Sequence, residues 1–223
     1  MPLKSPLDPV FTRLILIRHG ETEWNRSRTI QGQHDVPLNG TGRAQAEAVA
    51  CRLANERIDA VYTSDLARAR QTAEAIARPH RLAVIAEPGL RERHWGRYQG
   101  LRFDEIEGLA PEAHARMVVR DPGYVLEGGG ESIEGLVARV RAALGRLVAD
   151  RAGQTVVAVA HGGVLDAAHR IASGMPLDSA RSFDLPNAAI NIIDGDGLRW
   201  SIRDWARVDH LDGLARYDEL SER

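Results

Sequence analysis

Four consecutive aliphatic residues, at positions 14–17, are followed at once by Arg18, His19 and Gly20. An unbroken aliphatic run of this length is typical of a strand that is buried on both faces of a parallel sheet. Open α/β sheets bind their ligands where such parallel strands end. At that position an arginine can hold two phosphate oxygens, an imidazole can attack phosphorus, and a glycine lets the backbone approach closely.

Apolar stretches of strand length alternate along the chain with segments in which apolar residues recur at helical spacing. This alternation predicts a three-layer α/β/α sandwich with a mostly parallel central sheet and right-handed crossovers. The last two strands flank an Asp-Gly-Asp-Gly turn and are expected to form an antiparallel hairpin. Strands are expected at about 58–63, 82–85, 155–160, 188–193 and 198–202, and helices at about 39–55, 66–77, 131–150 and 162–172.

The expected helix at 66–77 carries Arg68 in its first turn. Ser64 and Asp65 are natural N-caps for this helix, and Pro79 is expected to end it. Because the apolar positions of the helix form a separate face, we expect Arg68 to lie off that face, near the end of the preceding strand.

The length of 223 residues is compatible with one domain that spans residues 1–223. Residues 101–130 have an irregular pattern with two prolines and a run of three glycines, and we expect them to form a small lid over one end of the sheet. Residues 1–12 and 204–223 are expected to be loose termini.

The formal net charge of −2 argues against nucleic-acid or anionic-membrane partners, which require a basic excess. Lys4 is the only lysine, which excludes a phosphate-binding or Schiff-base lysine in the core. Cys51 is the only cysteine, which excludes a cysteine-based zinc site. The first residues do not resemble a signal peptide, and no segment approaches the length of a membrane span. We therefore expect a soluble cytoplasmic protein.

Polar side chains of complementary kinds follow four of the expected strands. Parallel strands place their carboxyl ends on the same edge of a sheet, so these side chains are expected to converge there. They are Arg18 with His19, Ser64 and Asp65 with Arg68 just beyond, Glu92, and His161.

The sequence blocks that carry these residues resemble the signature blocks of the histidine phosphatase superfamily, which includes the cofactor-dependent phosphoglycerate mutases. The resemblance extends from Leu14 to about Leu211. The blocks are Leu16-Ile17-Arg18-His19-Gly20-Glu21-Thr22, Ser64-Asp65-Leu66-Ala67-Arg68-Ala69, Leu90-Arg91-Glu92-Arg93, Gly129-Gly130-Glu131-Ser132, Ala160-His161-Gly162-Gly163 and Pro186-Asn187-Ala188.

The resemblance implies that His19 is a nucleophile that forms a phosphohistidine. Arg18 and Arg68 would hold phosphate oxygens, and a protonated His161 would add positive charge from the opposite side. Glu92 would protonate the leaving oxygen and then activate water, for which its pKa should be raised. The arginines and imidazoles would supply the charge that a metal ion supplies elsewhere, so no metal is expected.

Further residues are expected around the phosphate. Gly162 opens a helix whose free N–H groups can face an anion. Asn25 either contacts the phosphate or caps a turn, and Thr22, Gln31 and Gly32 are further candidates in the same loop.

Several residues compete for these roles. Glu21, Asp104 and Glu105 are rivals of Glu92 for the role of the acid. Trp95 and Tyr98 are expected to pack in the lid. Candidate readers of the rest of the substrate are Arg93, Arg97, Arg102, Arg116 and Arg120.

Three functions are compatible with this pattern. The first is hydrolysis of a small phosphorylated metabolite, which the short lid without an Arg-Arg pair favours. The second is a phosphoglycerate mutase-type phosphotransferase, which would need a bisphosphoglycerate primer. The third is a non-catalytic module that binds phosphorylated ligands. The substrate stays open, and an exposed edge strand near the hairpin makes a homodimer conceivable.

Overall fold

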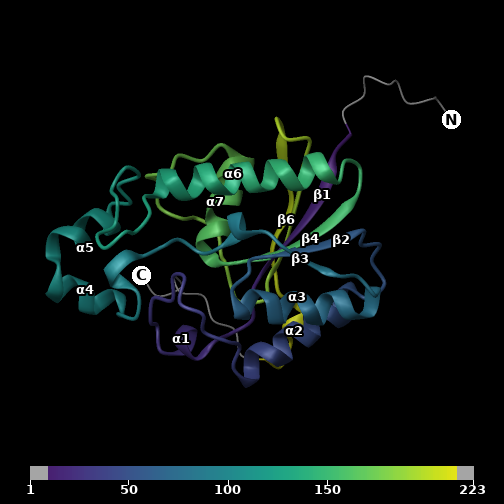
Figure 1. Cartoon of the computed structure of the whole chain (residues 1–223), viewed down its shortest axis with the longest axis horizontal. Coiled ribbons are helices and arrows are strands. Elements are labelled where there is room, and N and C mark those ends of the chain that lie inside the picture. The colour runs from purple at the N-terminus through teal and green to yellow at the C-terminus, as the bar shows by residue number, and fades with distance from the viewer. Residues whose placement is uncertain (1–9, 215–223) are drawn as a thin grey trace.

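Six strands form a sheet in the order β3-β2-β4-β1-β5-β6 in the computed structural model, which describes residues 10–214 (Figure 1). The first four strands in chain order run parallel, whereas β5 and β6 are antiparallel to their neighbours. The strands are β1 (Thr12–Arg18), β2 (Ala60–Thr63), β3 (Val84–Ala86), β4 (Thr155–Ala160), β5 (Ile190–Gly195) and β6 (Trp200–Arg207).

Helices cover both faces of this sheet, as Figure 1 shows. One face carries α2 (Gly40–Leu53) and α3 (Ala67–His80), and the other carries α6 (Ile133–Asp150) and α7 (Gly162–Ser173). The three-layer α/β/α arrangement with a mostly parallel sheet is therefore confirmed.

The aliphatic run of β1 divides its side chains between the two layers. Leu14 and Leu16 pack with α6 and α7, and Ile15 and Ile17 pack with α2 and α3. All four are almost completely buried, because successive side chains of a strand point to opposite faces of the sheet. Both faces need apolar residues, which is why the run is unbroken.

The register between β1 and β4 determines which residues meet at the carboxyl edge of the sheet. Arg18, the last residue of β1, pairs with Ala160, the last residue of β4. His19 and His161, which follow these two residues, therefore leave the sheet side by side.

Residues 101–130 contain two short helices, α4 (Phe103–Leu109) and α5 (Pro111–Val118), which extend beyond one end of the layers (Figure 1). Tyr98, Ile106, Ala113 and Leu126 form a separate small core beneath these helices, and Trp95 packs against it. The lid thus has its own apolar core. Tyr98 is buried in it, whereas Trp95 packs against it and also lines the cavity beside it.

The boundaries of α3 differ from the sequence-based prediction. Leu66 is the N-cap, and its apolar side chain cannot accept a hydrogen bond. Asp65 pairs with the guanidinium of Arg91, and Asp35 accepts the backbone N–H of Ala67 at 2.6 Å. Pro79 does not end the helix; it lies inside the last turn, and the chain leaves the helix at Arg81, which has a φ of 57°. A proline in the last turn disturbs little of the helical hydrogen bonding. The helix ends at Arg81, whose backbone is in the left-handed conformation.

The expected loose termini are also partly wrong. The chain from 204 to 207 belongs to β6, and it is followed by a 3-10 turn whose Leu211 is fully buried. Thr12 begins β1 and is buried, and its hydroxyl donates to the carbonyl of Arg151 at 3.0 Å. The rest of the predicted termini, 1–9 and 215–223, lies outside the described residues.

The other strand boundaries shift slightly. β2 begins at Ala60 rather than at 58, and β3 is Val84–Ala86 rather than 82–85. The predicted antiparallel hairpin is confirmed as β5 and β6, and β6 is an edge strand of the sheet.

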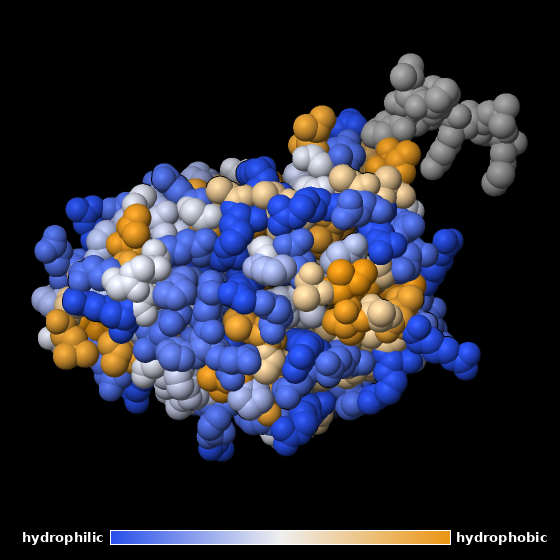
Figure 2. Space-filling model, in the orientation of Figure 1, coloured by the Kyte–Doolittle hydropathy of each residue, from blue (hydrophilic) through white to orange (hydrophobic). Residues whose placement is uncertain are grey.

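The face of the molecule shown in Figure 2 is mostly hydrophilic, with separate apolar areas. One of them lies at the end formed by α4 and α5, where Leu109, Val118, Val119 and Val125 are exposed. Among residues 10–214, no helix is long and apolar enough to cross a membrane.

Candidate active site

A cavity of about 510 Å³ opens between the carboxyl edge of the sheet and the lid. Arg18, His19, Arg68, Glu92 and Gly162 all line it, although they come from four separate segments of the chain. The structure thus brings together most of the side chains that the strand ends were expected to supply.

His19 is held in one orientation by its own backbone. Its Nδ1 lies 2.7 Å from the carbonyl oxygen of Gly20, so Nδ1 carries the proton and donates it. The other ring nitrogen, Nε2, accepts a hydrogen bond from Nε of Arg68 at 3.3 Å. Nε2 is therefore the nitrogen with the lone pair, next to a fixed positive charge.

Gly20 has a different use from the one expected. A Cβ at this position would lie 2.4 Å from the carbonyl oxygen of Gly42, so the glycine permits close packing of the β1 end against α2. The backbone N–H of Gly20 donates to the hydroxyl of Thr72 on α3, which further fixes the residues that follow the strand.

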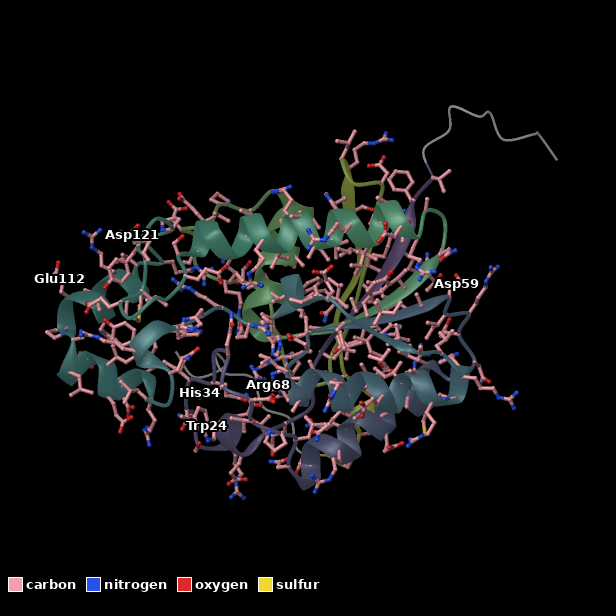
Figure 3. All side chains as sticks on the ribbon, viewed as in Figure 1. Trp24, His34, Asp59, Arg68, Glu112 and Asp121 are labelled. Atoms are coloured by element: carbon pink, nitrogen blue, oxygen red, sulfur yellow. The ribbon has the colours of Figure 1, made fainter. Side chains whose placement is uncertain are left out.

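Arg68 is fully buried and anchored on both terminal nitrogens. Nη1 donates to the carbonyl of His34 at 2.8 Å, and Nη2 donates to the carbonyl of Gly32 at 2.7 Å. Figure 3 shows Arg68 at the centre of the molecule, with His34 and Trp24 on its lid-facing side. On the other side of His19, Nη1 of Arg18 donates to the carbonyl of Leu185. Both guanidinium groups are therefore preorganised.

His161 stands directly behind the nucleophile candidate. Its ring centroid lies 5.1 Å from that of His19, and the ring is completely buried. Neither of its ring nitrogens has a hydrogen-bond partner among the described residues. Buried polar atoms are nearly always paired, so two unpaired nitrogens on one buried ring are unusual within residues 10–214.

The pKa values of both imidazoles lie well below the ordinary value of 6.5. Burial is the largest cause for each. The charge of Arg68 is the next cause, and Arg18 also contributes to both. Both rings are accordingly neutral near pH 7 in the structure as described, which differs from the protonated His161 that we considered above.

Glu92 points its carboxylate at the first turn of α7. Oε2 accepts the backbone N–H of Gly163 at 3.0 Å, and Oε1 accepts the backbone N–H of Arg93 at 2.7 Å. A Cβ on Gly163 would lie 2.3 Å from Oε1, so only glycine leaves room for the carboxylate. The acid is placed at the positive end of a helix and within the cavity wall.

Each of the three rival acids is hydrogen-bonded to another residue, and of the three only Asp104 lines the cavity. Glu21 accepts a hydrogen bond from the side-chain amide of Asn39 and does not line the cavity. Asp104 pairs with Arg102, and Glu105 accepts the backbone N–H of Arg102. The geometry therefore favours Glu92 for the role of the acid.

Asn25 caps a turn rather than facing the cavity. Its Oδ1 accepts the backbone N–H of Thr22, while the Thr22 hydroxyl accepts the backbone N–H of Asn25, in a capping box at the start of α1 (Glu23–Arg26). Neither residue lines the cavity. The pair shapes the loop after β1.

Gln31 and Gly32 do line the cavity. The carbonyl of Gly32 holds Arg68, and Oε1 of Gln31 is buried without a partner among residues 10–214. Gly162 is the first residue of α7, as the sequence indicated, and His161 is the N-cap of this helix.

The expected substrate readers fall into two groups. Arg93, Arg102 and Arg120 line the cavity, whereas Arg97 and Arg116 form ion pairs with Glu127 and Asp121 on the lid. Figure 3 shows Asp121 and Glu112 at the outer end of the lid, away from Arg68.

Sequence reasoning missed three contributors. Arg28 and Arg181 line the cavity, although they lie in irregular segments that carry no spacing signal. Asn187 donates from Nδ2 to the carbonyl of His19 at 2.9 Å and so fixes the backbone of the nucleophile candidate. Asn187 lies in the block Pro186-Asn187-Ala188, and the family resemblance of that block was the feature of the sequence that could have indicated its role.

No group of three or more His, Cys, Asp or Glu side chains in the described part of the chain is arranged to hold a metal ion. The positive charge in the cavity wall comes from arginine side chains instead.

Comparison with known proteins identifies the family. Residues 14–208 match the model of the histidine phosphatase superfamily, branch 1. The chain belongs to this superfamily and is an enzyme of it.

Some of the similar proteins are named as phosphoglycerate mutases or mutase-like proteins, and others are named as phosphatases. The chain is 40% identical over 209 residues to phosphoglycerate mutase-like protein 4 of Arabidopsis thaliana, covering 92% of this chain and 89% of that protein. It is 39% identical over 206 residues to the metal-independent phosphoserine phosphatase of the same plant, covering 91% and 84%. A mycobacterial glucosyl-3-phosphoglycerate phosphatase in complex with VO3 superimposes with a TM-score of 0.79 at 33% identity, covering 88% of this chain and 99% of that one.

Proposed function

We propose that this protein is a metal-independent phosphomonoesterase that hydrolyses a small phosphorylated metabolite through a phosphohistidine at His19. The observation that carries the proposal is the neutral imidazole whose Nε2 faces Nε of Arg68 in a cavity that also holds the Glu92 carboxyl group. A neutral imidazole is nucleophilic without prior deprotonation, which suits it for attack on phosphorus.

In the first step, Nε2 of His19 attacks phosphorus and the bond from phosphorus to the ester oxygen breaks. Glu92, in its acid form, gives its proton to the departing oxygen, so an alcohol leaves. In the second step, the Glu92 carboxylate takes a proton from water while the water oxygen attacks phosphorus. The N–P bond breaks, and inorganic phosphate, free His19 and protonated Glu92 are regenerated.

The arginines act on the phosphoryl oxygens in both steps. Phosphoryl transfer depends mainly on positioning and charge stabilisation, and the anchored guanidinium groups of Arg18 and Arg68 provide both. A bound dianion favours the charged form of a nearby imidazole, so we propose that His161 takes up a proton together with the substrate. Both of its buried ring nitrogens, which have no partner among residues 10–214, would then carry an N–H that can donate a hydrogen bond.

A carboxylate near the phosphate is the substrate feature that we favour. The names of two relatives refer to phosphoserine and glucosyl-3-phosphoglycerate, both of which combine a phosphate ester with a carboxylate. The outer cavity supplies arginines that suit a second anionic group. They are Arg28, Arg93, Arg102, Arg120 and Arg181.

A mutase is the second candidate. The lack of an Arg-Arg pair in the lid favoured hydrolysis at the level of sequence, but the fold gathers arginines from separate segments into the same cavity. The carboxylate of a phosphoglycerate therefore has possible partners here. Incubation with 3-phosphoglycerate, with and without 2,3-bisphosphoglycerate, separates the two: a mutase makes 2-phosphoglycerate only with the primer, and a hydrolase releases phosphate without it.

Hydrolysis of p-nitrophenyl phosphate in excess chelator tests the proposal. We expect the parent chain to be active and His19→Ala to be inactive, while His80→Ala, at the far end of α3, keeps the parent rate. Activity that disappears in chelator, or that persists in His19→Ala, would overturn the phosphohistidine route.

A further inference from the structure

Arg139, on α6, contacts the backbone of the segment that carries Glu92 at three points. Its Nη1 donates to the carbonyl of Gly89 at 2.9 Å and to the carbonyl of Arg91 at 2.8 Å. Its Nη2 donates to the carbonyl of Glu92 itself at 3.4 Å. One guanidinium therefore binds three of the four consecutive carbonyl groups of residues 89–92, including that of the proposed acid.

The orientation of this guanidinium is set by Glu131. The two carboxylate oxygens of Glu131 accept Nε and Nη2 of Arg139 at 3.0 and 2.7 Å, which is a bidentate pair. Such a pair fixes the plane of the guanidinium and not only its distance. The carbonyl of Glu131 also accepts Nε of Arg93 at 2.9 Å, which ties the residue after Glu92 to the same point.

The segment around Glu92 has little regular structure to hold it. A 3-10 turn covers Pro88–Leu90, and residues 91–95 belong to neither a helix nor a strand. The carbonyls of residues 89, 91 and 92 accept hydrogen bonds from side chains instead. The carboxylate of Glu92 accepts the N–H of Gly163, and its carbonyl accepts Nη2 of Arg139 at 3.4 Å and Nε2 of Gln33 at 3.1 Å. Arg139 differs from Gln33 in that it also binds the carbonyls of Gly89 and Arg91, so it orients the segment as well as the residue.

We propose that Arg139, oriented by Glu131, is a positioning residue for proton transfer by Glu92. This inference rests on the proposed function, because it assigns Arg139 a part in delivering the proton to the leaving oxygen. Lysine cannot replace arginine here: an ammonium group is a compact donor that cannot span three carbonyls and a bidentate carboxylate.

Two aryl phosphates that differ only in a para-nitro group isolate this role. p-Nitrophenyl phosphate releases an acidic phenol that departs readily without a proton, whereas phenyl phosphate releases a poorer leaving group that needs one. We expect Arg139→Lys, which keeps the charge near His161, to lower kcat/KM on phenyl phosphate at least about tenfold more than on p-nitrophenyl phosphate. Equal losses on the two substrates would mean a general structural effect and would overturn the inference.

A matched control comes from the same helix. Arg146 lies seven residues further along α6 and pairs with the carboxylate of Glu87, through an exposed ion pair that includes no backbone carbonyl. Arg146→Lys is expected to leave both rates unchanged. A selective loss on phenyl phosphate in this control as well would show that any arginine of α6 has the effect, and would contradict the assignment to Arg139.

A double-mutant cycle supplies the second readout. In the Glu92→Gln background no proton can be delivered, so Arg139→Lys should cost little more than Glu92→Gln alone. Full additivity of the two losses would overturn the inference. If Arg139→Lys folds poorly, Glu131→Gln tests the same geometry and should show the same dependence on the leaving group. Lack of hydrolysis of either substrate by the parent chain would instead overturn the proposed function, and the inference with it.

Discussion

Oε2 of Glu92 accepts the backbone N–H of Gly163 at 3.0 Å, which joins the segment after β3 to the first turn of α7. The contact brings the proposed acid next to the helix that follows His161. It exists only because residue 163 has no side chain, since a Cβ there would lie 2.3 Å from Oε1 of Glu92.

Gly163→Ala should therefore displace the acid while leaving the nucleophile and the arginines in place. We expect kcat/KM for phenyl phosphate to fall roughly 100-fold, which is within the range that a general acid contributes. Gly145→Ala, at an α6 position where a Cβ meets nothing within 4 Å, is the control and should keep the parent rate. Parent-like activity of Gly163→Ala would show that the contact between residues 92 and 163 is dispensable.

The low pKa of His161 makes stability depend on pH in a defined direction. Below the ordinary pKa of 6.5, His161 is protonated in the unfolded chain but stays neutral in the folded protein. The free energy of unfolding therefore falls as pH falls. Above that value both states are neutral and this residue contributes no pH dependence. The slope for one histidine is at most about 1.4 kcal/mol per pH unit.

Comparison with His161→Asn isolates this contribution from that of the carboxylates. Urea unfolding at about pH 7.5 and about pH 5.5 should show the parent losing more stability than the variant on acidification. The same experiment in saturating phosphate should reduce the difference, because the dianion favours the protonated ring. An equal loss in parent and variant would contradict the direction of the pKa shift.

The lid is joined to α7 by Arg120, which donates to the carboxylate of Asp166 at 2.8 Å and to the carbonyl of Leu177 at 3.3 Å. Arg120→Ala removes these contacts and one cavity arginine together. We expect KM for a substrate that carries a carboxylate to rise roughly threefold to tenfold, because the lid is positioned less accurately.

Arg116→Ala serves as the control for this experiment. Its ion pair with Asp121 is on the surface of the lid, and such pairs contribute little to stability or placement. KM should stay within about twofold of the parent value. Similar increases in the two variants would show that the lid is sensitive to any loss of charge, and would contradict a specific role for the contact with α7.

The convergence of the strand ends was predictable because parallel strands have only one carboxyl edge. The run at 14–17 and the strand at 155–160 both read as buried strands, and their register then brings Arg18 beside Ala160. This register places the backbones of His19 and His161 next to each other, and their ring centroids lie 5.1 Å apart. Fold and central site follow from the same few residues.

The loops were less predictable, since their contacts join segments that are distant along the chain. Asn25 was equally compatible with a phosphate contact or a cap, and only the position of Thr22 decides for the cap. Arg28 and Arg181 reach the cavity through irregular segments that have no period to read. The strand at 204–207 was missed because its polar residues lie on an edge strand, where little burial is required.

The central claim is that the phosphoryl group is carried by His19. Glu92→Gln should form this intermediate from p-nitrophenyl phosphate, because the leaving group needs no proton, but should hydrolyse it slowly, because no base activates water. Rapid quenching in alkali, digestion and mass spectrometry should then locate one phosphoryl group on the peptide that contains His19, with none in the Glu92→Gln/His19→Ala double variant. A phosphoryl group on another residue, or phosphate release in a burst without any phosphorylated peptide, would contradict the account.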